Sequence, residues 1–264
     1  IQYQYMAPGV FTTEEFEYAK SLEKKIFYDV KYGPIPAVIL AVIILTGWEL
    51  FVYLSQIPEI VLPAPTSVII ALWKLLSEGG LSNHLFVTLI EIFSGLFLGV
   101  GCGVILGVLI GLIPFLERTV LPLVIAFEAV PKIAIAPILV IWFGYGLLSK
   151  IVITATISFF PVLSNAMVGL RSAPMEEVEM LYAHTATSWQ VFKMVRLARA
   201  MPFIFAGIDV AIVLSVIGAV VGEFVGAKAG LGYLILQRNF SFDMAGVFAV
   251  LIILSLVGIT LHNI

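Results

Sequence analysis

The chain has 264 residues, of which 61% are hydrophobic and 12% are charged, and its mean hydropathy is +1.11. Soluble domains carry about 25% charged residues, so this chain cannot cover its surface with polar groups and belongs in a lipid bilayer. Its net charge of −3 gives no indication of a nucleic-acid partner, and we expect none.

The N-terminal segment, residues 1–34, is mostly polar and has no signal-peptide pattern. Residues 12–28 are typical of an amphipathic helix, with Thr12 or Thr13 as N-cap, acidic residues in the first turn and lysines in the last. Because the apolar stripe is narrow, we expect this helix on the membrane surface or against a partner. We therefore separate a cytoplasmic N-terminal segment, 1–34, from a transmembrane domain, 35–264.

Six apolar segments are long enough to cross a bilayer, which takes about 20 helical residues. They are residues 35–54, 85–113, 119–143, 151–170, 202–222 and 244–264. The stretch 63–79 is too short to cross before Lys74, and we expect an interfacial helix there. The sequence therefore predicts an all-α membrane protein with six transmembrane helices.

The positive-inside rule orients these spans. If the N-terminus is inside, nine lysines and arginines fall on internal segments, namely Lys20, Lys24, Lys25, Lys31, Arg118, Arg171, Lys193, Arg196 and Arg199. Four fall outside, namely Lys74, Lys150, Lys228 and Arg238. We therefore expect both termini, and the polar segment 171–199, in the cytoplasm.

The second span carries five glycines at intervals of four residues: Gly95, Gly99, Gly103, Gly107 and Gly111. Steps of four residues keep these glycines near one face of a helix. Small residues at this spacing let a neighbouring helix approach closely in lipid. We expect them to serve helix packing, and a flexing role in transport stays open.

The third span carries Glu128 and Lys132, which lie four residues apart and can face each other. Pro131 and Pro137 stand on either side of the lysine and should loosen the helical hydrogen bonds. An unpaired charge at mid-bilayer costs at least about 2.5 kcal/mol, so the pair should face protein or water. It is either a structural ion pair or part of a translocation path.

The fourth and fifth spans add polar candidates. Thr154, Ser158 and Asn165 share one face of the fourth span, where they suit interhelical hydrogen bonds and the wall of a polar passage equally. Asp209, in the fifth span, should face inward because it is costly in lipid. We include these four residues with Glu128 and Lys132 as path candidates. Glu223, in a Gly-rich turn, is expected to be solvated or to cap a helix.

Nothing in the sequence indicates a catalytic, metal or nucleotide site. Cys102 is the single cysteine, and His84, His184 and His262 are far apart in the expected topology. No Gly-x-x-x-x-Gly-Lys-Ser/Thr phosphate loop occurs. We expect no metal, no cofactor and no enzymatic activity in this chain alone, so a partner or an ion gradient must supply energy.

The polar segment 171–199 resembles the cytoplasmic loop of ABC importer permeases, which reads Glu-Ala-Ala, three residues, Gly, nine residues, Ile, any residue, Leu-Pro. The positions that match in register are Glu179, Val195 and Leu197. The positions that depart are Met180 and Leu181 for the alanines, Thr185 for the Gly and Ala198 for the Pro.

Other motifs follow in the order expected of the nitrate/sulfonate/taurine-type permeases of bacterial ABC importers, and the likeness covers residues 60–264. They are Leu62-Pro63-Ala64-Pro65-Thr66-Ser67, Pro131-Lys132-Ile133-Ala134-Ile135-Ala136-Pro137, Trp142-Phe143-Gly144-Tyr145-Gly146, and Gly222-Glu223 with Gly230-Leu231-Gly232-Tyr233.

The resemblance implies a type I ABC importer permease fold in the bacterial inner membrane. It implies a homodimer, or a dimer with a close paralogue, with two ATPase subunits that bind ATP and Mg and an extracytoplasmic binding protein. The implied ATPase-coupling residues are Glu179, Met180, Leu181, Ala183, His184, Thr185, Ala186 and Thr187, with Gln190 and Phe192 as support.

We therefore expect a permease subunit that forms the path for a small anionic or heterocyclic nutrient. One alternative is an ion-coupled secondary transporter that uses Glu128, Lys132 and Asp209 as coupling charges, although no internal inverted repeat is visible. The other is a membrane-embedded enzyme, which would need a clustered catalytic set.

Overall fold

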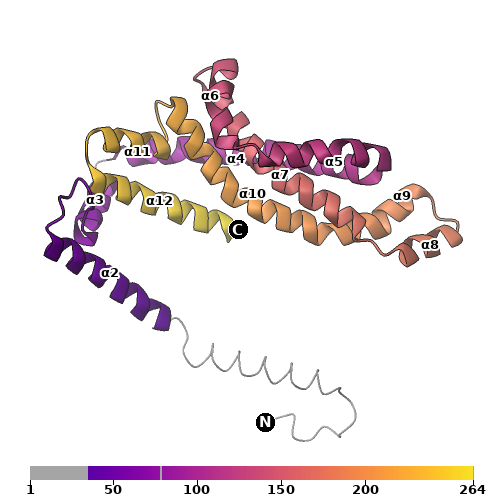
Figure 1. Ribbon diagram of the computed structural model, residues 1–264, viewed down its shortest axis with the longest axis horizontal. Coiled ribbons are helices and arrows are strands. Elements are labelled where there is room, and N and C mark those ends of the chain that lie inside the picture. The colour runs from indigo at the N-terminus through magenta and orange to yellow at the C-terminus, as the bar shows by residue number, and fades with distance from the viewer. Residues whose placement is uncertain (1–34, 78, 264) are drawn as a thin grey trace, which may run out of the picture. The chain divides into compact units, whose positions relative to one another are not determined.

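The computed structural model describes residues 35–77 and 79–263, and the predicted helix at 12–28 lies outside them. The described elements are helices, labelled as in Figure 1: α2 (Ile35–Ser55), α3 (Pro65–Ser77), α4 (Leu81–Leu112), α5 (Pro114–Ala129), α6 (Lys132–Phe143), α7 (Leu147–Arg171), α8 (Met175–Ala183), α9 (Ser188–Val191), the π-helix η2 (Phe192–Arg196), α10 (Leu197–Gly226), α11 (Leu231–Phe240) and α12 (Met244–His262).

The chain divides into two compact units, residues 1–58 with 64–66 and residues 59–63 with 67–264. In the first unit, the carboxylate of Glu49 on α2 accepts hydrogen bonds from the backbone N–H of Thr66, at 3.1 Å, and from its hydroxyl, at 2.9 Å. This satisfies an N–H in the first turn of α3 that has no partner within the helix. The second unit contains the remaining helices.

Five helices of the described chain are long and apolar enough to cross a membrane: α2, α4, α7, the continuous helix Ser188–Gly226 and α12. The sixth predicted span, 119–143, is a bent pair in which Arg118–Phe127 and Lys132–Phe143 meet at 93°. The break falls at Val130 and Pro131, where proline lacks an N–H and disfavours helical geometry at the residue before it. The six-span prediction is confirmed with this pair taken as one span.

Helix α7 packs along α4 in the core of the second unit (Figure 1). A Cβ added to Gly95 would lie 2.4 Å from the Cβ of Thr154, and one added to Gly99 would lie 2.3 Å from the hydroxyl oxygen of Ser158. No side chain fits at that separation. The glycine face of α4 that the sequence predicted is therefore where α4 approaches α7 most closely.

A neighbouring face of α7 packs against α10 in the same manner, and Thr154 lies at both contacts. A Cβ at Gly207 would lie 2.9 Å from the Cβ of Asn165, and one at Gly218 would lie 2.8 Å from the Cα of Thr154. Helix α7 is therefore held between two close-packed neighbours, and its polar side chains lie at the crossings.

A separate apolar cluster joins α3, α11 and α12 at one end of this bundle. Val68 and Leu75 of α3 are buried with Leu231 and Leu234 of α11 and Val250 of α12. The residues between the predicted spans, 63–79 and 223–243, meet in this cluster. This cluster holds the interfacial helix α3 at one end of the bundle. The positive-inside rule places that end outside the cytoplasm.

Candidate functional site

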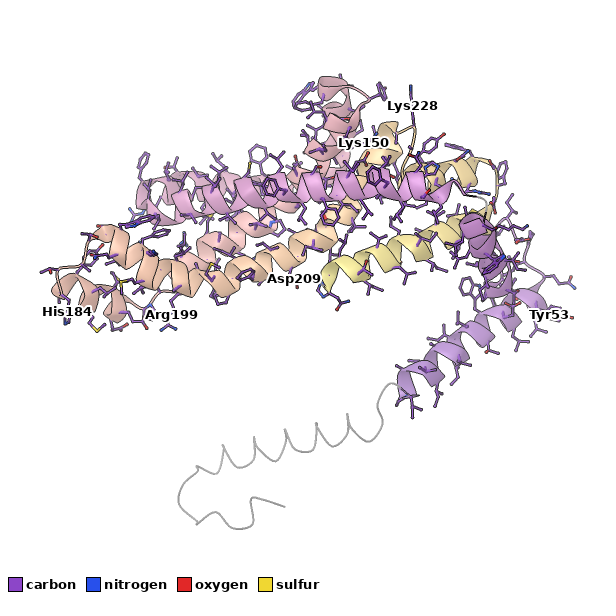
Figure 2. All side chains as sticks on the ribbon, turned by 180° about the vertical axis from the view of Figure 1, so that it is seen from behind. Tyr53, Lys150, His184, Arg199, Asp209 and Lys228 are labelled. Atoms are coloured by element: carbon purple, nitrogen blue, oxygen red, sulfur yellow. The ribbon has the colours of Figure 1, made fainter. Side chains whose placement is uncertain are left out.

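Residues 172–196, here called the polar hairpin, fold into α8, a short turn, α9 and η2. The hairpin has an apolar core of its own, in which Val178, Val191 and Val195 are buried with Leu181 and Ala186 packed against them. Figure 2 shows His184 and Arg199 at one end of the second unit and Lys150 and Lys228 at the other. The hairpin is therefore a compact helical element at the end opposite α11.

The turn after α8 is a Schellman motif. The N–H of Ala186 donates to the carbonyl of Leu181 at 3.0 Å, and the N–H of Thr185 donates to that of Tyr182 at 2.9 Å. Thr185 has a φ of 62°, in the left-handed region where glycine is favoured and a β-branched residue is strained. This explains physically why the related loop pattern has glycine at this position.

The next helix begins with a capping box. The backbone N–H of Thr187 donates to Oε1 of Gln190 at 2.7 Å, and the N–H of Gln190 donates to the Thr187 hydroxyl at 3.4 Å. The role of Gln190 in coupling, implied by the resemblance, stays a prediction, and its side chain caps the helix after the turn. Caps on both sides fix the turn at residues 184–187.

An ion pair between Glu177 of α8 and Arg199 of α10 ties the hairpin to the membrane-spanning helix. Three large apolar side chains of the hairpin, Met175, Met180 and Trp189, are 56% to 68% exposed. A groove of about 440 Å³ opens beside Trp189. Exposed apolar patches on an element that is not buried in lipid mark contact surfaces.

The eight predicted coupling residues lie together on the end of α8 and the turn. Six of them are exposed, namely Glu179, Met180, Ala183, His184, Thr185 and Thr187, and two are half-buried, Leu181 and Ala186.

The path candidates are dispersed by comparison. Lys132 begins α6, and its Nζ lies 4.9 Å from the centre of the Phe160 ring. It borders an apolar pocket of about 470 Å³ between α4, α6 and α7, to which Cys102, Phe127 and Phe159 also contribute. The side chain of Glu128 is outside the described side chains, so its expected pairing with Lys132 stays a prediction.

The polar face of the fourth span sits at helix crossings. Thr154 and Ser158 are fully buried, and the Ser158 hydroxyl donates to the carbonyl of Thr154 at 2.8 Å. Asn165 is half-buried and donates to the carbonyl of Pro161 at 2.8 Å. These positions favour helix packing over the wall of a passage within this chain.

Asp209 does not point into the bundle of this chain. The expectation that it faces inward is therefore wrong for the single subunit. Its side chain is 54% exposed, and Oδ1 lies 2.9 Å from Nδ1 of His262 on α12. Figure 2 shows Asp209 part-way along α10, between the two ends of the bundle. A carboxyl group here must face water or another protein, because lipid would not solvate it.

Sequence reasoning missed a buried charge cluster near the α11 end of the bundle. Lys150 of α7 lies 3.6 Å from Glu91 of α4, with side chains 8% and 0% exposed. The carboxyl of Glu91 also interacts with that of Glu223 on α10. Glu91 is the one acid between Leu85 and Ile113, and a lone acid in an apolar span is the signal that could have revealed the cluster.

Glu223 connects this cluster to α11. Its carboxylate accepts from the hydroxyl of Thr88 at 2.6 Å, from the N–H of Gly232, and from the N–H of Tyr233 at 3.2 Å. Of the two roles expected for Glu223, solvated or capping, the structure shows capping, with Glu223 1% exposed. Gly230 must be glycine, since its φ is 122° and an added Cβ would lie 2.2 Å from the Glu223 carboxyl carbon.

The described residues contain no group of three potential metal ligands. Residues 99–264 match the family model of binding-protein-dependent transport system inner membrane components.

Curated relatives include the riboflavin transport system permease protein RibX of Chloroflexus aurantiacus, 40% identical over 83% of this chain and 82% of its own length. The formylaminopyrimidine transport permease protein ThiX of Halalkalibacterium halodurans is 37% identical over 80% and 84%. The taurine transport system permease protein TauC of Escherichia coli is 28% identical over 73% and 72%.

Among solved structures, a chain of the MetNI methionine ABC transporter in an inward-facing conformation matches with a TM-score of 0.57. The match covers 69% of this chain and 93% of that chain, at 23% sequence identity. At this sequence identity, the match supports a conclusion about the fold alone.

Proposed function

The chain belongs to the family of binding-protein-dependent transport system inner membrane components, and we propose that it couples to ATPase subunits through its polar hairpin. It is a permease subunit of an ABC importer, a multi-pass inner-membrane protein that is not an enzyme by itself. The alternative of an ion-coupled secondary transporter is not favoured, because the relatives are permeases of ABC type.

The observation that carries this proposal is an exposed apolar surface on a rigid element at the hairpin end. Met180 and Trp189 project from a hairpin whose turn is capped on both sides. Such a surface fits a groove on a partner subunit, as an amphipathic helix does in other recognition modes. Glu179, exposed beside Met180, supplies a charge that can select the partner.

The hairpin is connected to the opposite end of the bundle by one uninterrupted helix. Ser188–Gly226 has 39 residues, which at 1.5 Å per residue makes it about 58 Å long. That exceeds the hydrocarbon core of about 30 Å. A displacement of the hairpin by an ATPase is therefore carried along α10 to Glu223, which is bonded to α4 and α11.

A second copy of this chain, or a close paralogue, completes the permease in our proposal. The half-exposed Asp209–His262 pair supports it, since the pair needs water or protein beside it at a depth where a lone subunit would offer lipid. An extracytoplasmic binding protein and two ATPase subunits, which hold ATP and Mg, are the further partners.

The substrate we propose is a small heterocyclic nutrient. Two relatives above 35% identity carry riboflavin and formylaminopyrimidine in their names. The apolar pocket with Phe127, Phe159 and Phe160 offers aromatic faces, and Lys132 adds a cation above one of them. Flat aromatic rings stack on such faces.

Co-expression with candidate ATPase subunits tests the coupling proposal. The wild-type chain is expected to co-purify with an ATPase and to support ATP hydrolysis. Glu179→Arg is expected to reduce both, whereas Lys228→Glu, a charge reversal on an exposed loop at the other end, leaves both unchanged. Equal loss in the two variants, or none in Glu179→Arg, argues against coupling through the hairpin.

The substrate class is tested separately in proteoliposomes with the binding protein present. Phe160→Leu is expected to reduce uptake of a heterocyclic substrate while ATPase binding stays intact. Uptake of only aliphatic sulfonates by the wild-type complex would contradict the substrate class and leave the coupling proposal standing.

A further inference from the structure

The buried cluster of Glu91, Lys150 and Glu223 contains two acids and one cation, and all three residues are buried. With both acids ionised, one positive and two negative charges leave a net charge of −1 in a region closed to water. Such an uncompensated charge is costly. The cluster shares no residue with the polar hairpin or with the apolar pocket beside Lys132, so its role is independent of the coupling and substrate proposals.

The register of three helices brings the two acids together. A Cβ added to Gly222 of α10 would lie 3.2 Å from the Cα of Lys150 on α7, so Glu223 lies next to the contact between these helices. On α4, Thr88 and Glu91 are three residues apart and share one face, and the Thr88 hydroxyl lies 2.6 Å from Oε1 of Glu223. The carboxyl groups of Glu91 and Glu223 therefore lie beside each other.

The two acids differ in their hydrogen bonds. The carboxylate of Glu223 accepts from one hydroxyl and from the N–H groups of Gly232 and Tyr233, and such bonds stabilise the charged form. Neither carboxyl oxygen of Glu91 has a hydrogen-bond partner among the described residues, although this side chain is fully buried. Glu223 is therefore placed as the anion of the cluster, and Glu91 as the acid that can be neutral.

The ligand that balances this cluster is a proton rather than a metal ion. The described residues contain no group of three His, Cys, Asp or Glu side chains that could hold a metal ion. The ammonium of Lys150 lies 3.6 Å from Glu91, where it would repel a metal cation. Two adjacent buried carboxyl groups bind one proton instead, because like charges at short separation cannot both ionise.

We propose that Glu91 is a proton-binding site. Its carboxylic acid hydroxyl donates to the Glu223 carboxylate, and its carbonyl oxygen accepts from the ammonium of Lys150. One bound proton makes the cluster neutral and satisfies the Glu91 oxygens that otherwise lack hydrogen bonds. The proton thereby joins α4, α7 and α10 at a place where two ionised acids would push them apart.

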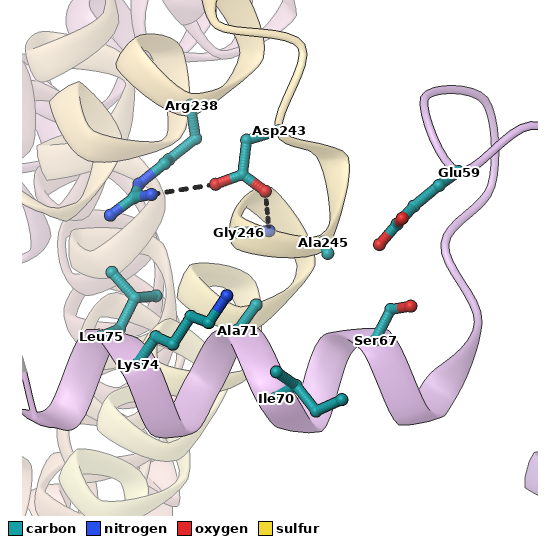
Figure 3. A pocket seen from close by; sticks show the side chains of 10 residues that line it. All are labelled: Glu59, Ser67, Ile70, Ala71, Lys74, Leu75, Arg238, Asp243, Ala245 and Gly246. Atoms are coloured by element: carbon teal, nitrogen blue, oxygen red, sulfur yellow. Dashed lines mark hydrogen bonds and ion pairs between the residues drawn. The ribbon is translucent and has the colours of Figure 1, made fainter.

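The proton also acts on α11, whose first turn is held by Glu223. The far end of α11 is held by a separate ion pair, in which Nη1 of Arg238 donates to Oδ2 of Asp243 at 2.9 Å beside a polar pocket of about 510 Å³ (Figure 3). That pair needs no proton, because it already joins opposite charges. Loss of the proton from Glu91 leaves two carboxylates in contact, which weakens the hold on the first turn. Proton binding therefore stabilises one arrangement of α10 relative to α11.

Two further titratable rings border the first turn of α11. Nδ1 of His84, on α4, lies 3.1 Å from the backbone nitrogen of Gly230, and the ring centroids of His84 and Tyr233 are 6.0 Å apart. Neither ring gives the infrared band of a carboxylic acid. A carboxylic acid band therefore distinguishes a proton on Glu91 from a proton on either ring.

Infrared difference spectroscopy on the full chain, purified in detergent at neutral pH, tests the site directly. The carbonyl stretch of a protonated carboxylic acid is separate from the bands of carboxylates and amides. The wild-type minus Glu91→Gln difference spectrum is expected to contain this stretch, shifted by exchange into D2O. Glu59→Gln removes an exposed acid outside the cluster and is the matched control, for which no such band is expected.

Thermal unfolding of the cluster variants tests which acid carries the proton. Glutamine has the shape of a protonated glutamate, so Glu91→Gln should change the apparent Tm by less than about 2 °C. Glu223→Gln removes the anion and leaves Lys150 without a counter-charge, so the Tm should fall by about 6 °C or more. If Glu91 is instead the anion paired with Lys150, the two effects are reversed.

Two outcomes would overturn the proposal. One is the absence of the acid band from the wild-type minus Glu91→Gln spectrum. The other is a fall in Tm for Glu91→Gln that equals or exceeds the fall for Glu223→Gln. If Glu223→Gln does not fold, the acid band and the Tm of Glu91→Gln still decide, because a lost band or a Tm lowered by about 6 °C or more in Glu91→Gln contradicts a neutral Glu91.

Discussion

The buried cluster of Lys150, Glu91 and Glu223 makes a quantitative prediction for Lys150→Met. The lysine side chain is 8% exposed, and its Nζ lies 3.6 Å from Glu91. Methionine keeps the packing volume but leaves two acids buried without a cation. Removing one partner of a buried ion pair costs about 3–5 kcal/mol. At about 2–4 °C per kcal/mol for a chain of this size, the apparent Tm should fall by about 6–20 °C.

The assay is heating in detergent followed by fluorescence-detected size-exclusion chromatography, which measures the fraction that stays monodisperse. Lys228→Met removes an exposed lysine from the same end of the bundle and should change the Tm by less than about 2 °C. The double variant Lys150→Met with Glu91→Leu should recover part of the loss, because it removes one uncompensated acid. A Tm for Lys150→Met within 2 °C of wild type would refute the reasoning.

Three further predictions follow from single backbone positions. Gly99→Ala should destabilise the α4–α7 packing and lower the Tm, since the added Cβ would lie 2.3 Å from the Ser158 hydroxyl oxygen. Gly101→Ala, whose added Cβ would meet nothing within 4 Å, should be neutral or stabilising. Equal Tm values for the two variants would contradict the packing. Thr185→Gly should raise stability by about 0.5–1 kcal/mol by relieving the left-handed threonine, an effect that thermal unfolding detects and that Thr185→Val should not produce. Gly230→Ala should cost at least about 2 kcal/mol because of its φ of 122° and the adjacent Glu223 carboxyl, and a Tm like that of wild type would show that the turn can rearrange.

The spans could be predicted from the sequence because lipid imposes both their length and their apolar composition. The segments 85–113 and 244–264 agree closely with α4 and α12. The bend in the third span was predicted only as a loosening at Pro131. Its angle of 93° depends on how α6 packs against α7 and α10, which no local pattern encodes.

The buried charges could not be predicted because their partners lie far apart in sequence. Lys150 was counted among the external cations that orient the chain, yet the structure buries it against Glu91. Without it, three external cations remain against nine internal ones, so the expected orientation is strengthened. Asp209 is a second case. Because a charge is costly in lipid, the sequence indicates that Asp209 needs a polar partner, but it does not indicate which surface provides that partner.

The turn of the polar hairpin is the part of the chain whose structure depends most on a local pattern, and the role of the hairpin in coupling stays a prediction. Glu179, Val195 and Leu197 gave the register, and the departure at Thr185 falls where the structure has a left-handed residue. The caps that hold the turn follow from side chains three residues apart, which a sequence displays directly.

The most direct test of the account is a photo-cross-linking amino acid placed at Met180, in the complex of the full chain with its ATPase subunits. Our account predicts a cross-link from position 180 to an ATPase, and none from Phe242, an exposed residue near the opposite end of the bundle. A cross-link from position 242 and none from position 180 would contradict the proposal that the polar hairpin is where the permease receives the energy of ATP hydrolysis.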